Sequence, residues 1–230
     1  MFSLDIQDVY PLGQARRARR GARGQIRQAV NQRHQLESLR EASALLDEAD
    51  EWQSSVYNRL VSNKNHGNVG SHNQSYLAYI AEDRGATLSR WGQIAGYLAI
   101  KFRDHRTHTY ESELRETFDH FVDADRVYMA GDHYGLAARS ALVAANVARV
   151  AGKPLVVAHW FGRAALRAAE AWALQPSGDR TWREVLGSVA VLSNYNDADN
   201  QLEQTIFGGI YGPSEHQAEA SAATKDELVA

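Results

Sequence analysis

The sequence contains no cysteine and only four prolines and two methionines in 230 residues. Without a thiol, the chain can form neither a disulfide framework nor a cysteine-ligated zinc site, and it has no thiolate nucleophile. No apolar run approaches the roughly 18 residues that indicate a membrane-spanning helix. The signatures Gly-x-x-x-x-Gly-Lys, Gly-x-Ser-x-Gly and His-Glu-x-x-His are also missing. These absences favour a cytoplasmic, non-enzymatic protein, and no pattern predicts a cofactor.

The scarcity of proline leaves long stretches in which apolar residues recur every three or four positions, whereas no segment alternates as a strand would. We therefore expect an all-α fold with a long N-terminal helix. The helices should form either an antiparallel bundle or a short helical-repeat array. Connections between the central helices are only a few residues long, so neighbouring helices should be antiparallel.

Shifts in composition divide the chain into five segments. A mixed segment, 1–13, precedes a proline-free segment, 14–62, which we interpret as a basic arm leading into a long amphipathic helix. Residues 63–73 are rich in asparagine and glycine and predict a loop. Residues 74–212 should form the helical core domain. Residues 213–230 are rich in alanine, serine and charged side chains and predict a disordered tail.

Residues 113–175 contain three helical runs, of which the second and third are apolar on nearly every side. A helix that is apolar all round is buried, so these runs should form the stable core, with Trp160 and Trp172 inside it. Gly131 should end the first run, and Asp132 should cap the start of the second. Pro154 suits the first turn of the third.

Glycines also punctuate the earlier part of the core domain. We expect one helix to start near Gln74 and stop at Gly85, and the next to start near Thr87. Gly92 and Gly96 lie beside the apolar stripe of that next helix, four residues apart. Small residues at this spacing let another helix approach closely.

Residues 124–151 resemble one tetratricopeptide repeat. Such repeats combine an early small residue, a Gly-Asp turn, an aromatic residue after the turn and two alanines seven residues apart. The matching positions here are Ala124, Gly131, Tyr134, Ala137 and Ala144. The resemblance implies a groove that binds a protein partner, and it implies no catalytic activity.

The strongest functional signal is a run of arginines with no acidic residue between Asp8 and Glu37. Guanidinium groups match phosphate oxygens bidentately, and a dense basic segment supplies the salt-dependent part of nucleic-acid affinity. We expect an arm that frays when unbound and lies outside the core. The other interpretations are a helical face paired with acids elsewhere, or a site for anionic lipid or an acidic protein. The candidate residues are Arg16, Arg17, Arg19, Arg20, Arg23, Arg27 and Arg33.

A narrow apolar seam with a 3-4 spacing follows the arginines and contains Gln53 as its one polar member. Such a seam is typical of a coiled coil or a helical hairpin. We expect self-association through it, although packing against the chain's own core explains the spacing equally well. The seam residues are Leu39, Ala42, Leu46, Ala49, Val56 and Leu60.

Several acidic and histidine residues have spacings that invite a metal-site interpretation. Glu113, Glu116, His120 and Asp123 share one helical face, but no second helix offers the matching Glu-x-x-His, so we interpret them as a solvated face. The remaining histidines and carboxylates have ordinary structural interpretations. We interpret His66 and His72 as loop residues, His159 as a hydrogen-bonded core residue, and Asp197 and Asp199 as helix caps, with Glu203 nearby.

Three hypotheses follow. The first is a helical protein that binds nucleic acid or assembles through its arginine arm. The second is a tetratricopeptide-like module whose arm binds an acidic protein. The third is a helical-bundle metalloenzyme using Glu116 and His120, which the missing partner helix disfavours.

Overall fold

The computed structural model describes residues 6–32, 36–65, 71–102 and 108–174, together with Trp182, Arg183 and Val185. The predicted all-α class is confirmed, because the described ranges form helices and contain no strand. The helices are α1 (Ile6–Gln32), α2 (Leu36–Asn65), α3 (Ser71–Phe102), α4 (His108–Ala130), α5 (Tyr134–Val150) and α6 (Pro154–Leu174).

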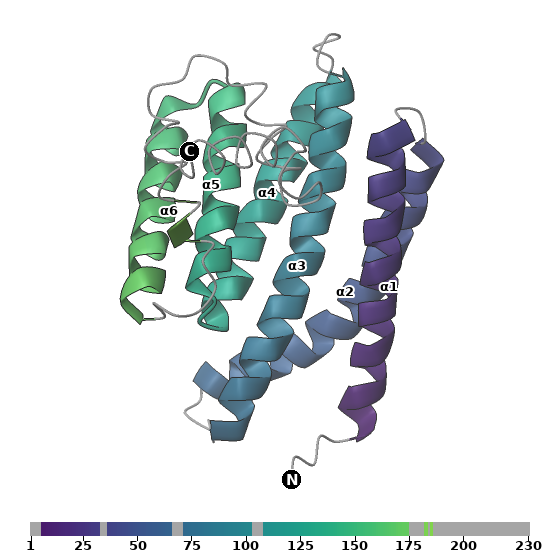
Figure 1. Ribbon diagram of the computed structural model, residues 1–230, viewed down its shortest axis with the longest axis vertical. Helices are drawn as coiled ribbons and strands as arrows, with labels where there is room; N and C mark the ends of the chain where they lie inside the picture. Colours follow the sequence, from purple (N-terminus) through teal and green to yellow (C-terminus); the bar gives the residue numbers. More distant parts are fainter. Residues whose placement is uncertain are drawn as a thin grey trace, which may run out of the picture.

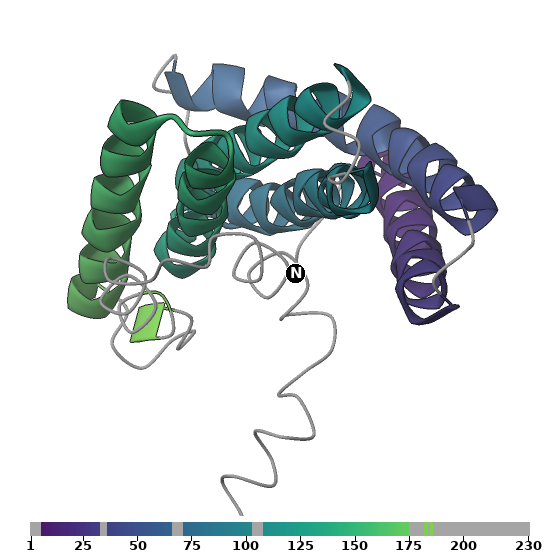
Figure 2. The same cartoon turned by 90° about the horizontal axis from the view of Figure 1, so that it is seen from above.

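The helices are arranged in sequence order, with α1 at one edge of the molecule and α6 at the other (Figure 1). Each helix packs mainly on its neighbours in the sequence, and α1 also touches α3. Seen from above, the array is bent into an arc, with α2 and α4 on its outer side and α3 and α5 on its inner side (Figure 2). This arc sets the arginines of α1 beside the inner helices.

The arginine-rich segment is part of the packed fold, which corrects the expectation of an arm outside the core. It belongs to α1, which begins at Ile6, within the segment 1–13 that was expected to precede the basic arm. A face of small side chains lets α1 lie close to its neighbours, and this burial explains why the segment is ordered as a helix. The buried residues are Ala15, Ala18, Ala22, Ile26 and Ala29.

The seam residues are buried within the chain. Leu39, Ala42 and Leu46 lie in the main core, Ala49 packs against α1, and Val56 and Leu60 pack with α3, each at most 7% exposed. The polar seam member Gln53 is buried too, and its Oε1 accepts a hydrogen bond of 2.8 Å from Thr87 Oγ1. These side chains therefore pack within the chain, as expected for the second explanation of the seam, and self-association stays a prediction.

The helix end expected at Gly85 is wrong, because α3 runs unbroken through this residue. A Cβ at Gly85 would lie 2.5 Å from the ring of Tyr128, and one at Gly92 would lie 2.6 Å from the ring of Phe121. These glycines let α3 and α4 approach closely, as expected for Gly92. The cost of glycine inside a helix, about 1 kcal/mol, is thus offset by packing between helices.

The turn between α4 and α5 also differs from the expectation. The His133 N–H donates to the Tyr128 carbonyl at 2.9 Å and the Asp132 N–H to that of Met129 at 3.2 Å, which closes the helix as a Schellman motif. Asp132 takes the left-handed position, with φ of 61°, and His133 rather than Asp132 is the N-cap of α5. Gly131 instead packs against α3, where a Cβ would lie 2.5 Å from Ala81 Cβ.

The two central helices α5 and α6 have similarly apolar sequences but differ in how much of each is buried. Residues of α5 are buried almost all round, and Gly152 ends the helix with φ of 68°. Pro154 begins α6, as expected. However, α6 buries only one face, and Trp172 is 59% exposed whereas Trp160 is 8% exposed. The expectation that Trp172 lies inside the core is therefore wrong.

Candidate anion-binding surface

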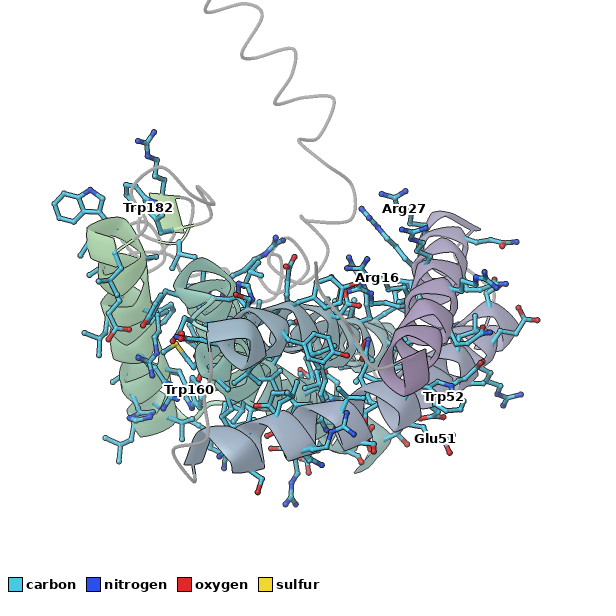
Figure 3. All side chains as sticks on the ribbon, turned by 90° about the horizontal axis from the view of Figure 1, so that it is seen from below. Arg16, Arg27, Glu51, Trp52, Trp160 and Trp182 are labelled. Carbon is cyan, nitrogen blue, oxygen red and sulfur yellow. The ribbon has the colours of Figure 1, made fainter. Side chains whose placement is uncertain are left out.

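Five arginines of α1 lie on one face of the helix, which we call the arginine face. Their spacings of three and four residues return to the same side of a helix, and their run spans about 17 Å along the axis. Figure 3 shows Arg16 and Arg27 toward the inner side of the arc, opposite Glu51 and Trp52 of α2. The arginine face comprises Arg16, Arg19, Arg20, Arg23 and Arg27.

Two residues of this face hold α1 on α3. Asp83 is 5% exposed, and its two carboxylate oxygens accept from Arg16 Nε at 3.0 Å and from the terminal nitrogen of Arg19 at 2.7 Å. Arg19 also donates to the backbone carbonyl of Asp83 at 3.2 Å, and the Arg16 guanidinium lies 4.3 Å from the centre of the Tyr79 ring. The single carboxylate of Asp83 therefore holds both guanidinium groups and balances one of their two positive charges.

The next residues of the face are more open. Arg20, Arg23 and Arg27 are all exposed. Neither Arg20 nor Arg23 forms an ion pair with a carboxylate in the described part of the chain. Arg17 is exposed but points away from this face, since it follows Arg16 by one position. Arg33 lies outside the described residues.

Arg90 of α3 adds a charge to this surface that sequence reasoning missed. Burial, together with the positive charges of Arg23, Arg19 and Arg139, lowers its pKa to about 10. Its one hydrogen bond among the described residues goes to the neutral side chain of Gln93. Charges on α1 and α5 therefore act on the Arg90 guanidinium of α3.

No sequence pattern could have singled out Arg90. Neither Arg90 nor Arg139 has another arginine three or four residues away in its own helix. Arg90 belongs with the arginines of α1 only because α3 packs against α1 in the fold.

Elsewhere, buried charges are matched. Arg84 donates to Asp50 at 3.0 Å, which joins α3 to α2. The fully buried Asp125 of α4 accepts from Arg163 of α6 at 2.8 Å, although burial still raises the pKa of the Asp125 carboxyl. These pairs connect neighbouring helices, in contrast with the unpaired arginines near Arg90.

The acidic face of α4 does not assemble into a ligand set. Glu116 and Asp123 are exposed, and Asp123 pairs with Arg126 at 2.9 Å. The ring of His120 stacks on Trp91 with centroids 5.4 Å apart, and burial lowers its pKa. Among the described residues, no three histidine or carboxylate side chains are grouped as a metal site would require.

The remaining histidine and carboxylate assignments have mixed outcomes. His159 is exposed, with its ring 5.6 Å from that of Trp160, so its assignment as a core residue is wrong. His72 belongs to α3, so its assignment as a loop residue is wrong, whereas His66 lies outside the described residues. Asp197 and Asp199, which were interpreted as helix caps, and their neighbour Glu203 also lie outside the described residues.

The chain matches no known protein family, no curated protein sequence and no solved structure. In the described helices, no stretch is long and apolar enough to cross a membrane.

Proposed function

We propose that this protein binds nucleic acid, without catalysing a reaction, through the arginine face and the arginines that converge beside it. The observation that carries the proposal is the set Arg20, Arg23, Arg90 and Arg139. These side chains come from three helices and have no carboxylate partner among the described residues. Their mutual repulsion is relieved when a polyanion supplies the missing negative charge.

The uneven distribution of charge along the chain supports this proposal. The whole chain carries a net charge of −3, yet the segment between Asp8 and Glu37 contains seven arginines and no acidic residue. Contacts between arginines and phosphates position a nucleic acid without reading its bases. We therefore expect binding with little sequence preference, and we place the protein in the cytoplasm as part of the same proposal.

The experiment compares two double variants in a fluorescence anisotropy titration with a labelled mixed-sequence oligonucleotide. Arg20→Ala/Arg23→Ala removes two exposed arginines from the arginine face. Arg115→Ala/Arg126→Ala removes two exposed arginines from α4, each within 3.8 Å of an acid on its own helix. The first should weaken binding at least about tenfold, because a hydrogen bond to a charged group contributes about 1.5–3 kcal/mol.

The α4 double variant should bind as the wild type does. Equal binding by all three proteins would show that the arginine face does not contact the oligonucleotide. The absence of any binding at low salt would end the nucleic-acid proposal.

The second candidate is a module that binds an acidic protein, as the tetratricopeptide resemblance implies. It is supported by the complete burial of Ala124, Ala137 and Ala144 between neighbouring helices, where such repeats place small residues. The two candidates share the arginines and differ in the ligand. Binding of an acidic peptide that an oligonucleotide does not displace would favour this second candidate.

A further inference from the structure

Six exposed residues of α6 line the side of the helix opposite its buried residues. They recur at spacings of four and three, the pattern by which helices pair with one another. Leu155 is 86% exposed and Leu166 is 57% exposed. The six residues carry no carboxylate, ammonium or guanidinium group. This surface, which we call the α6 stripe, comprises Leu155, His159, Gly162, Leu166, Ala169 and Ala173.

An apolar stripe on the outer side of α6 needs an explanation. This helix lies at the edge of the array and buries its other face against α5 (Figure 1). The outer face of a surface helix is ordinarily polar, and so are the terminal faces of helical arrays. The guanidinium groups that border the stripe are held within the chain. Arg163 pairs with Asp125 at 2.8 Å, and Arg167 pairs with Glu170 at 2.8 Å.

We propose that the α6 stripe packs on the α6 stripe of a second copy of this chain, with the two helices antiparallel about a two-fold axis. Such an interface is self-complementary and closes as a dimer. The order of side-chain sizes supports this arrangement. With the axis level with Ala164, each larger side chain of one copy lies opposite a small residue of the other. The pairs are Leu155 with Ala173, His159 with Ala169, and Leu166 with Gly162.

The sizes also argue against a parallel pair. Two parallel helices in register would place leucine on leucine and glycine on glycine, which leaves gaps at the small residues. Well-packed interfaces interdigitate large and small side chains without such voids. The antiparallel arrangement therefore fits the stripe better.

Gly162 gives an independent reason for a close partner. Glycine inside a helix costs about 1 kcal/mol relative to alanine. At Gly85 and Gly92 of α3 this cost is offset by rings of α4 that occupy the space of a side chain. A Cβ at Gly162, by contrast, would have nothing within 4 Å. In the antiparallel dimer, Leu166 of the second copy would fill this space.

The residues that follow α6 are the other candidate cover for the stripe, but those described lie elsewhere. Val185 is buried in the main core, and Trp182 packs against that core with its ring 6.4 Å from the ring of Trp172. Figure 3 shows Trp182 on the inner side of the arc. These contacts direct the chain back toward the core, so they favour a second copy as the occupant.

The size of the stripe sets the expected strength of the dimer. From Leu155 to Ala173 it is about 27 Å long, and a helix is about 10 Å wide, so each copy offers about 300 Å², the size of a patch that marks an interaction site. Interfaces below about 1,200 Å² in total are typical of weak or transient complexes. We therefore expect a dimer in reversible exchange with the monomer. It does not depend on the arginine face, which lies on α1 at the other edge of the molecule (Figure 1).

The experiment measures the mass of the full chain by analytical ultracentrifugation over a wide range of concentrations. The wild type should pass from monomer to dimer as the concentration rises. Gly162→Leu should weaken dimerisation at least about tenfold, because the added side chain meets the second copy but no atom of its own chain. The matched control is Gly24→Leu, at an exposed glycine of α1 that also has nothing within 4 Å, and it should dimerise as the wild type does.

Two further tests address the antiparallel register. Gly162→Leu/Leu166→Gly again places leucine opposite glycine, so it should restore the dimerisation that Gly162→Leu removes. Because the chain has no cysteine, Leu155→Cys and Ala173→Cys each introduce a single thiol. When mixed and oxidised, these two variants should form a disulfide with each other in preference to themselves, since the bond requires Cβ atoms about 3.5–4.5 Å apart.

Three results would overturn the proposal. A wild type that stays monomeric at every concentration would leave the stripe to the chain's own following residues or to a different protein. A dimer that Gly162→Leu leaves intact would form through another surface. Preferential cross-linking of Leu155→Cys with itself would show that the helices are not antiparallel in this register.

Discussion

Asp83→Asn should lower stability and strengthen nucleic-acid binding at the same time. The carboxylate of Asp83 makes two ion pairs, at 3.0 Å to Arg16 and 2.7 Å to Arg19. The amide keeps the size and one acceptor oxygen but loses the charge. Removing one partner of a buried pair costs about 3–5 kcal/mol. The exposed fractions of 40% for Arg16 and 22% for Arg19 reduce this through solvent screening, so we expect about 1–2 kcal/mol.

The same substitution releases two arginines of the arginine face toward the ligand. Each further arginine that neutralises a duplex phosphate steepens the slope of log affinity against log salt by about 0.9. Two released arginines should therefore steepen the slope by up to about 2 and raise affinity at low salt. A residue that served stability alone would not change the salt slope.

Urea unfolding gives the stability, and anisotropy titrations at several salt concentrations give the slope. The control is Asp50→Asn, which breaks the pair of Asp50 with Arg84 at 3.0 Å on the α2 side of α3. It should lower stability without changing the slope. Equal slopes for wild type and Asp83→Asn would refute the reasoning that Asp83 restrains arginines otherwise able to bind phosphate.

Three predictions concern the core. Gly131→Ala should cost about 1–3 kcal/mol by overpacking, since its Cβ would lie 2.5 Å from an atom of α3. Gly24→Ala should instead stabilise α1 by about 0.5–1 kcal/mol, because its Cβ would have nothing within 4 Å. Trp160→Ala should cost about 3–5 kcal/mol, and Trp172→Ala about 0.5 kcal/mol; urea unfolding measures all four. Burial lowers the pKa of His120, so the unfolded state binds more protons between that pKa and about 6.5. Stability should therefore rise as the pH rises across this window, and His120→Gln should remove that part of the rise.

Each of these predictions has a result that contradicts it. Equal effects of the two glycine substitutions would show that close packing at Gly131 is not what requires glycine. Equal losses for the two tryptophan variants would contradict the one-sided burial of α6. The same pH dependence in wild type and His120→Gln would show that burial of this ring has no effect on stability.

Periodicity was sufficient to predict the helices, because each buries a face repeated every three or four residues. It failed where burial depends on a partner. Gly85 reads as a helix end in isolation, yet α3 continues because the Tyr128 ring occupies the space of a side chain. The apolar sequence of α6 suggested burial all round, but only α5 has helices on enough sides to be enclosed.

The candidate site shows the same limit. The sequence pointed to arginines on α1, and their helical spacing already implied a shared face. It could not show that Asp83, more than sixty residues away, holds two of them. It could not find Arg90 either, since that residue becomes notable only beside Arg23 and Arg139.

The salt dependence of binding to a mixed-sequence single-stranded oligonucleotide tests the central claim most directly. Contacts from Arg20, Arg23, Arg90 and Arg139 predict a slope of log affinity against log salt of about −3 for the wild type, at about 0.7 per phosphate. Arg20→Ala/Arg23→Ala should reduce its magnitude by about half. A slope near zero, or a slope that this double variant leaves unchanged, would contradict the claim that these arginines bind the phosphates.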